Sequence, residues 1–516
     1  MVAEQQSIGI RVAKLLPEGV RLSGGSAKIL VEGITLDSRD VQVGDLFLAF
    51  PGENHDGRDF IAQALEAGAV SVLVEAEGFT AQSGDDTRII PVLGLAHQAS
   101  VIAGRFYDLP SDSMAITGIT GTNAKTTCTH LLAQLFALLG EKVGVVGTLG
   151  AGMSGFESEQ ADLCALTETG MTTPDAVRCQ QLLAELRDEG ARYVAMEVSS
   201  HSLVQGRVPG VNFDTAVFTN LSRDHLDYHS DMARYLDAKA SLFRLPGLKP
   251  AVINVNDPAG RELLASLPSK VECYRFGLAG RNKPFDAEVI ADNCHFSRTG
   301  MTADILSPWG KGKLSSTLLG EFNLSNLLAV ITSACAQGQD FKQVLSLVPQ
   351  LSAVAGRMQS VGSESGPQVV VDYAHTPDAL LQVLEVLRAQ GIGKLWCVFG
   401  CGGDRDRGKR RQMGEVASSR ADRTIVTSDN PRSESPEAII KDILQGIPDA
   451  ALVEPDRRAA ICEAIIRADS SDTVLIAGKG HERNQEIAGV YWPFDDVVEA
   501  TLALNKRLSA QAEGGR

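Results

Sequence analysis

The segment from Gly118 to Thr127 reads GITGTNAKTT and has residue types suited to holding a chain of phosphates. The spacing from Gly118 to the pair Lys125-Thr126 is that of a P-loop. In such a loop, backbone N–H groups and a helix N-terminus cradle phosphates, the lysine reaches the outer phosphates, and the hydroxyl ligates Mg²⁺. A plain glycine-rich turn before a buried helix is disfavoured, because strand, loop, Lys-Thr pair and amphipathic helix follow in the required order.

One position departs from the P-loop pattern. Ala124 stands where the second glycine is usual. If the loop requires a positive φ there, an alanine is strained, because its Cβ disfavours the left-handed region.

Four further side chains are considered for metal or proton chemistry. Glu197 follows the apolar run 193–196, and a carboxylate at a strand end near a P-loop commonly meets the nucleotide's Mg²⁺. His225 and His229 have the i, i+4 spacing of a zinc pair, but the glutamate of an HExxH motif is missing. Lys239, taken alone, has the features of a solvated lysine on a helix.

The elements that must position these residues are predicted from apolar runs and turn signals. Residues 59–68 predict a short amphipathic helix, residues 126–139 a helix closed by Gly140, and Leu380, Val383, Leu384 and Leu387 one face of a third helix. Predicted strands are 70–74, 115–119, 143–146, 193–196, 216–218, 251–255, 369–371, 395–399, 424–426 and 473–477. The alternation indicates α/β domains with mostly parallel sheets, whose ligands lie beyond the carboxyl ends of the strands.

Length and charge bound the function. At ~150 residues per domain, 516 residues allow three or four domains. A net charge of −16 disfavours a nucleic-acid binder but permits local basic pockets. Nine cysteines without a CxxC pair, no signal peptide and no run of ~18 apolar residues predict reduced thiols in a cytoplasmic protein without a membrane span.

A set of motifs, taken together, resembles the Mur ligases. Between about residues 35 and 490 the chain carries, in the order of that family, TLDSR (35–39), GITGTNAKTT (118–127), TTPD (172–175), EVSSH (197–201), NLSRDHLDYH (220–229), YLDAKASLF (235–243), GEFNLSN (320–326), AGRM (355–358), DYAHTPDAL (372–380) and GKGHE (478–482). The resemblance is to those that add the third residue of the peptidoglycan stem peptide. It implies that ATP converts a peptide carboxylate to an acyl phosphate, which the amine of an amino acid then attacks.

The resemblance also implies three domains: a smaller N-terminal α/β domain for a UDP-sugar (1–108), a central P-loop ATPase domain with a mostly parallel sheet (109–350), and a C-terminal Rossmann-like domain for the amino acid (351–516). It implies that Lys125 and Thr126 hold phosphates and Mg²⁺, that Glu197 and His225 ligate metal, and that Lys239 is an N-carboxylated lysine supporting a second Mg²⁺. The implied ATP contacts also include Gly121, Thr122, Asn123, Ala124, Thr127, Asn323, Asn326, Arg357 and Asp372.

Substrate residues follow from the same resemblance. For UDP-N-acetylmuramoyl dipeptide they are Leu36, Ser38, Glu53, Asn54 and His55, with Thr172, Thr173, Ser199, Gln205 and Arg207. For meso-diaminopimelate they are Arg405, Asp429, Asn430, Pro431, Arg432, Gly478 and Glu482. The planar fork of Arg432 suits a side-chain carboxylate, which lysine lacks, and Glu482 suits the distal ammonium.

Three alternatives compete with this interpretation. The DNPR motif (429–432) disfavours a lysine-adding ligase, and the TLDSR motif with an N-terminal sugar domain disfavours a folylpolyglutamate synthetase. Ala124 motivates a nucleotide-binding regulator with an impaired loop, which the intact substrate motifs disfavour. We expect a monomer.

Overall fold

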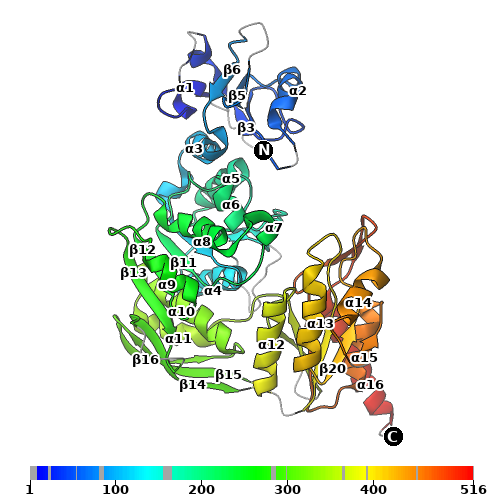
Figure 1. Ribbon diagram of the computed structural model, residues 1–516. Helices are drawn as coiled ribbons and strands as arrows, with labels where there is room; N and C mark the ends of the chain where they lie inside the picture. Colours follow the sequence, from blue (N-terminus) through cyan, green and yellow to red (C-terminus); the bar gives the residue numbers. More distant parts are fainter. Residues whose placement is uncertain are drawn as a thin grey trace, which may run out of the picture.

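The computed structural model describes residues 9–20, 22, 25–53, 55–80, 86–154, 166–280, 286–297, 299–362, 366–390, 393–448 and 451–514. Three sheets rich in parallel strands follow one another along the chain, at the top, left and lower right of Figure 1. This is the three-unit α/β architecture expected from the sequence. No helix within the described ranges is long and apolar enough to cross a membrane.

The first unit is a four-stranded parallel sheet in the order β3-β4-β5-β6. Its elements are β1 (Ile10–Arg11), α1 (Val12–Leu15), β2 (Leu30–Val31), β3 (Gly33–Thr35), β4 (Asp45–Ala49), α2 (Ile61–Ala67), β5 (Ser71–Glu75), β6 (Ile89–Val92) and α3 (Leu95–Phe106). The helix expected over 59–68 is split, since a 3₁₀ turn over Gly57–Phe60 precedes α2. Gly68 ends α2 in the left-handed region at φ 113°.

The central unit is a ten-stranded sheet in the order β16-β15-β14-β13-β12-β11-β7-β10-β8-β9. Its first half comprises β7 (Ala115–Thr120), α4 (Lys125–Leu138), β8 (Val143–Gly147), β9 (Gly150–Met153), α5 (Ala176–Asp188), β10 (Tyr193–Glu197), α6 (Ser200–Val204), β11 (Thr215–Phe218), α7 (Leu226–His229) and α8 (Met232–Ala240). Its second half comprises β12 (Pro250–Asn254), α9 (Pro258–Leu264), β13 (Glu272–Leu278), β14 (Val289–Ser297), β15 (Gly300–Ser307), β16 (Gly310–Ser316), α10 (Glu321–Ala336) and α11 (Phe341–Leu347).

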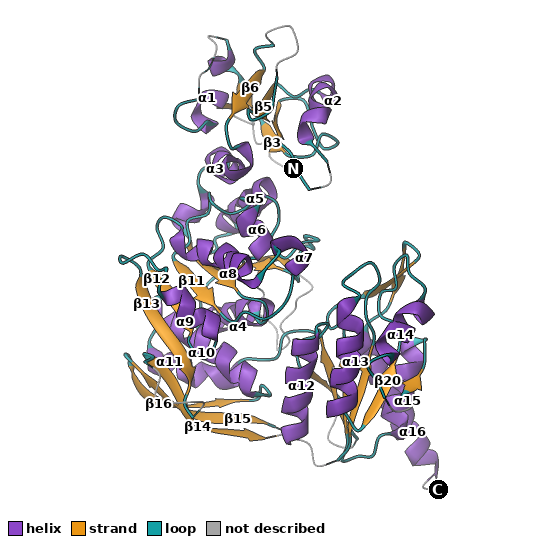
Figure 2. Ribbon diagram, viewed as in Figure 1, coloured by secondary structure: helices purple, strands orange, loops and turns teal. Residues whose placement is uncertain are grey.

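The strands from β8 to β14 in this order pair in parallel, whereas β9, β15 and β16 pair antiparallel at the two edges. The sequence predicted β7, β8, β10, β11 and β12 but missed the parallel strand β13, as well as β14 and the edge strands β9, β15 and β16. The strands β14–β16 run along the lower border of the unit in Figure 2. Apolar cores cover both faces of the sheet, one against α4 and α10 and the other against α5 and α8.

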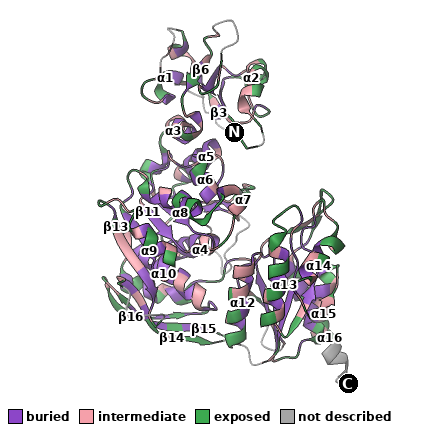
Figure 3. Ribbon diagram, viewed as in Figure 1, coloured by how far each residue is buried: buried purple, intermediate pink, exposed green. Residues whose placement is uncertain are grey.

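The third unit is a six-stranded sheet in the order β17-β18-β22-β19-β20-β21, parallel except for β17. Its elements are β17 (Gln359–Val361), β18 (Gln368–Asp372), α12 (Pro377–Gln390), β19 (Leu395–Phe399), α13 (Gly408–Arg420), β20 (Arg423–Val426), α14 (Pro436–Leu444), β21 (Leu452–Val453), α15 (Arg457–Arg467), β22 (Thr473–Ala477), the hairpin β23 (Asn484–Ile487) and β24 (Val490–Pro493), and α16 (Asp496–Gly514). The apolar face predicted for α12 is buried against the sheet (Figure 3).

The loop between β7 and α4 contains the backbone strain anticipated from the sequence. Ala124 has φ 71° and precedes the first residue of α4. At the other end, α4 stops at Leu138 and Gly140 takes φ 87°, as predicted for a glycine-closed helix.

Replacing Ala124 by glycine should stabilise the protein by about 1 kcal/mol, because glycine removes the Cβ penalty of the left-handed region. Chemical denaturation of the two proteins measures the difference. Ala137→Gly, within the same helix, is the matched control and should destabilise by about 1 kcal/mol. Equal losses for both variants would contradict strain at Ala124.

Candidate functional site

The phosphate loop lies at the carboxyl end of β7, the seventh strand in the order of the central sheet. A Cβ on Gly121 would lie 1.9 Å from Oγ1 of Thr219, so the loop can pass this point only with glycine. The ammonium of Lys125 donates to the carbonyl oxygens of Gly121 and Thr122, both at 2.9 Å. Burial lowers the pKa of Lys125.

Glu197 lies beside this loop because β10 pairs in parallel with β7 and ends at the same edge. Its carboxylate accepts hydrogen bonds from Thr126 Oγ1 at 3.0 Å, from the backbone N of Thr148 at 2.9 Å and from Thr148 Oγ1 at 3.1 Å. The side chain is fully buried, which raises the pKa of Glu197, and none of the ion pairs in the described ranges includes it. A buried carboxylate next to a hydroxyl supplies oxygen donors of the kind Mg²⁺ prefers.

Lys239 is not a solvated helix lysine, because only 1% of it is exposed. Its Nζ donates to the carbonyl oxygen of Gly121 at 2.8 Å and lies 4.4 Å from the centre of the Tyr235 ring. Burial, and secondarily the charge of Lys125, hold the pKa of Lys239 well below its usual value. The two lysines therefore share one acceptor oxygen.

The two histidines of the sequence pair face different partners. His225 precedes α7 at φ 53°, and its Nε2 lies 3.4 Å from Oδ2 of Asp224. His229 is buried, with its Nε2 2.8 Å from Oγ of Ser200 and its ring stacked on Tyr235. Within the described ranges, no group of three or more His, Cys, Asp or Glu is arranged to hold a metal ion.

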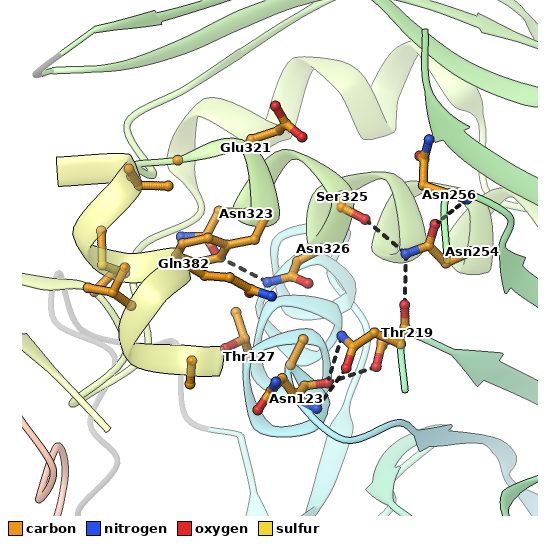
Figure 4. Close-up of a pocket in the computed structure, with 18 of the residues that line it drawn as sticks. Asn123, Thr127, Thr219, Asn254, Asn256, Glu321, Asn323, Ser325, Asn326 and Gln382 are labelled. Carbon is orange, nitrogen blue, oxygen red and sulfur yellow. Dashed lines mark hydrogen bonds between the residues drawn. The ribbon is translucent and has the colours of Figure 1, made fainter. Parts of the chain in front are cut away.

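A cavity of about 840 Å³ opens beside the phosphate loop, between the central and third units. Figure 4 shows its central-unit wall, where Asn326 donates to Oδ1 of Asn323 at 3.1 Å. Asn123, Ala124, Thr127, Arg357 and Asp372 also line it.

The third unit supplies two of these residues, Arg357 from the turn before β17 and Asp372 from the end of β18. Arg357 donates to Oγ1 of Thr126 at 3.4 Å, and its guanidinium stacks over Tyr373. Asp372 accepts from the backbone N atoms of Met358 at 2.7 Å and Ala374 at 2.8 Å. Burial raises the pKa of Asp372, so these bonds hold a carboxyl that costs free energy to ionise.

Sequence reasoning missed part of this wall. Asn254 and Asn256 line the cavity at the end of β12, and Asn254 donates to the carbonyl oxygen of Thr219 at 2.7 Å (Figure 4). The signal was present, since these polar residues lie at the end of the predicted strand 251–255. Ligand-binding residues lie at the carboxyl ends of parallel strands, and this rule, which located Glu197, also applies to Asn254 and Asn256.

The residues expected to contact the UDP-sugar peptide fall into two groups. On the central unit, Gln205 donates to Oε1 of Glu53 at 2.7 Å and accepts from Arg207, which also donates to the carbonyl oxygen of Thr173 at 2.7 Å. The hydroxyl oxygens of Thr148 and Thr172 lie 3.1 Å apart, and Ser199 caps α6. On the first unit, Ser38 is buried, Leu36 is half-buried and Glu53 and His55 are exposed, whereas Asn54 lies outside the described residues. The Glu53–Gln205 bond joins the two groups.

The DNPR segment follows β20 as predicted, and Arg432 has φ 52°. Its guanidinium donates to the carbonyl oxygen of Gly403 at 2.8 Å and lies 3.1 Å from Oε2 of Glu486. A Cβ on Gly402 would lie 2.9 Å from Nη1 of Arg432 and 3.8 Å from Cγ of Arg405, so the two arginines flank one turn.

Asn430 and Glu482 are bonded to each other, Nδ2 to Oε2 at 2.7 Å. Asp429 lies against Gly478, where φ is 118° and a Cβ would lie 2.5 Å from Oδ2 of Asp429. Pro431 is buried next to Arg432 in the chain. Lys479 contacts Asn430 and Glu482, and Glu486 pairs with Arg432. The sequence did not single out either residue. Lys479 lies inside the GKGHE motif, but a buried lysine gives no distinct sequence signal.

Three family models match the chain in order. They are the "Mur ligase family, catalytic domain" over residues 30–107, the "Mur ligase middle domain" over 119–334, and the "Mur ligase, glutamate ligase domain" over 356–480.

Full-length relatives agree with these models. The chain is 48% identical over 492 residues, 95% of this chain and 98% of the relative, to the UDP-N-acetylmuramoyl-L-alanyl-D-glutamate--2,6-diaminopimelate ligase of Ectopseudomonas mendocina. It is 49% identical over 478 residues, 92% of this chain and 95% of the relative, to the ligase of that name from Pseudomonas aeruginosa.

Solved structures show the same fold. A structure of a ligase of that name aligns with a TM-score of 0.70 at 35% identity, covering 97% of this chain and all 100% of the other. A MurF structure from Acinetobacter baumannii aligns with a TM-score of 0.59 at 18% identity, covering 87% and 90%. The chain belongs to the Mur ligase family.

Proposed function

We propose that this chain is the ATP-dependent ligase that joins meso-2,6-diaminopimelate to UDP-N-acetylmuramoyl-L-alanyl-D-glutamate in peptidoglycan synthesis. The relatives from Ectopseudomonas mendocina and Pseudomonas aeruginosa are named for this reaction, and they align over nearly the whole chain. The observation that carries the choice of amino acid is the guanidinium of Arg432, held by Gly403 and Glu486 at the end of β20. Such a fork binds a side-chain carboxylate, which diaminopimelate has and lysine lacks.

The phosphate loop and the adjoining cavity are assigned to ATP. Lys125 and Thr126 contact the phosphates, with Gly121, Thr122, Asn123, Ala124 and Thr127 forming the cradle and Asn323, Asn326, Arg357 and Asp372 completing the site. Lys125 donates only to loop carbonyls in the described structure, and bonds to phosphate oxygens would be stronger because donor and acceptor would then both be charged. Arg357 reaches the loop from the third unit, so domain approach and phosphate binding are coupled.

The oxygen atoms of Thr126 and Glu197 fit a first Mg²⁺, and we assign His225 and an N-carboxylated Lys239 to a second. Mg²⁺ offsets the charge between the peptide carboxylate and the γ-phosphate. Two buried amines on one carbonyl oxygen repel each other when both are charged, which favours a neutral Lys239. A neutral amine adds CO₂, with an N–C bond formed and one proton released, and the site then gains an anion instead of a second cation.

The remaining site residues are assigned by the unit on which each lies. Leu36, Ser38, Glu53, Asn54 and His55, with Thr172, Thr173, Ser199, Gln205 and Arg207, bind the UDP-sugar peptide. Arg405, Asp429, Asn430, Pro431, Arg432, Gly478 and Glu482 bind diaminopimelate. Domain boundaries at 108/109 and 350/351, a monomeric state and a cytoplasmic location complete the proposal.

The first test measures phosphate release with ATP and UDP-N-acetylmuramoyl-L-alanyl-D-glutamate. We expect release only when an amino acid is added, with kcat/KM for meso-diaminopimelate exceeding that for L-lysine by at least about 100-fold, because lysine leaves the Arg432 fork unpaired. Equal turnover of the two amino acids would refute the assigned specificity.

A second test concerns Lys239. Replacing it by alanine should lower kcat by at least about 100-fold, since the variant lacks the anion proposed to support Mg²⁺. Bicarbonate labelled with ¹³C should give a carbamate signal in the unmodified protein and none in the variant, and added bicarbonate should not restore activity. Full activity of the variant would rule out the carbamate role.

A third test separates chemistry from stability at Glu197. Glu197→Gln should lower Mg²⁺-dependent phosphate release by about 100-fold or more. The pKa of Glu197 is higher in the folded state than in the unfolded state. The free energy of unfolding therefore falls as the pH rises above the unfolded-state pKa of this carboxyl. At neutral pH the metal-free variant should therefore unfold no more easily than the parent, and a marked drop in its thermal midpoint would show that Glu197 is mainly structural.

A further inference from the structure

Lys479 lies within the GKGHE segment but is not among the residues assigned to a substrate. It is 0% exposed, and its Nζ donates to Oδ1 of Asn430 at 2.9 Å, to Oε2 of Glu482 at 2.9 Å and to the carbonyl oxygen of Asn484 at 2.6 Å. An ammonium has three N–H donors, so all three are used. Lys479 therefore cannot contact a substrate without losing a bond.

The three acceptors come from separate elements. Asn430 follows β20, Glu482 follows β22, and Asn484 is the first residue of β23. Lys479 is thus the point at which the two segments assigned to diaminopimelate are joined.

These bonds also fix which way each acceptor points. Oδ1 of Asn430 accepts from Lys479 and from the backbone N of Glu486 at 3.0 Å, so its Nδ2 must face Glu482. Oε2 of Glu482 accepts from both Lys479 and Asn430, whereas Oε1 accepts nothing from the described residues. One carboxylate oxygen is held in place and the other is left for a ligand.

We infer that Lys479 is a positioning residue that fixes Glu482 and Asn430 for recognition of the distal ammonium of the amino-acid substrate. The inference rests on the proposed function. The buried ammonium holds one oxygen of Glu482, and it sets the register between the strand ends that carry Arg432 and Glu482.

The test uses two substrates that differ only at the ammonium in question: diaminopimelate and 2-aminopimelate, which lacks one amine. The kcat and KM for each are measured in the full-length protein and in Lys479→Met, with ATP and the UDP-sugar peptide saturating. Lys441→Met, which removes an exposed lysine from α14 of the same unit, is the control.

For Lys479→Met we expect the KM for diaminopimelate to rise about tenfold or more while the KM for ATP changes less than about twofold, as for loss of one charged hydrogen-bond partner. The preference for diaminopimelate over 2-aminopimelate should fall by a similar factor. Lys441→Met should leave both unchanged. Lys479→Gln, which keeps N–H donors without the charge, should fall between parent and Lys479→Met, and it replaces that variant if the latter does not fold.

An unchanged preference in the variants, with activity falling only in proportion to the folded fraction, would show that Lys479 is structural and overturn the inference while leaving the proposed function intact. Absence of diaminopimelate-dependent phosphate release in the parent protein would overturn both.

Discussion

The carbonyl oxygen of Gly121 accepts hydrogen bonds from two buried lysines, Lys125 and Lys239, and this shared acceptor is the constraint on which the site depends. Two ammonium groups on one oxygen repel each other strongly where little water is present. Burial lowers the pKa of both lysines, and the charge of Lys125 lowers the pKa of Lys239 further. An anion bound at Lys125 would relieve this repulsion, so the loop favours a negatively charged ligand.

The phosphate loop also contacts a buried group of the opposite charge, the carboxylate of Glu197. Glu197 is a fully buried carboxylate whose hydrogen-bond donors are all neutral, and burial raises its pKa. A cation beside Glu197 and an anion beside Lys125 would stabilise both buried charges, and a metal–nucleotide complex supplies both. This explains how a chain with net charge −16 can hold anionic substrates, because the charge that matters is the local charge of a few desolvated groups.

Much of this arrangement was predictable from the sequence, because parallel strands place the residues at their carboxyl ends along one edge of the sheet. Glu197 was located in this way. The DNPR segment was singled out by the family resemblance and follows β20 as expected, and strain at Ala124 was expected only if that position has a positive φ, which it does. The burial of Lys239 was missed, although Tyr235 and Leu236, four and three residues earlier in α8, place it on the buried face of that helix. It depends on how α8 packs against the loop, as shown by the contact of Lys239 with Gly121, which is 118 residues away in the sequence.

The GKGHE segment (478–482) contacts the turn that carries Arg357 on one side and the DNPR segment on the other. A Cβ on Gly356, next to Arg357 of the nucleotide site, would lie 2.1 Å from the backbone N of His481, and a Cβ on Gly480 would lie 2.7 Å from Cβ of Tyr373. On its other side the same segment carries Lys479 and Glu482, bonded to Asn430. Because backbone packs this closely, a displacement of Arg357 and Tyr373 would be transmitted to Lys479 and its hydrogen-bond partners. The segment proposed to recognise the distal ammonium of the amino acid is thus packed directly against the segment proposed to bind ATP.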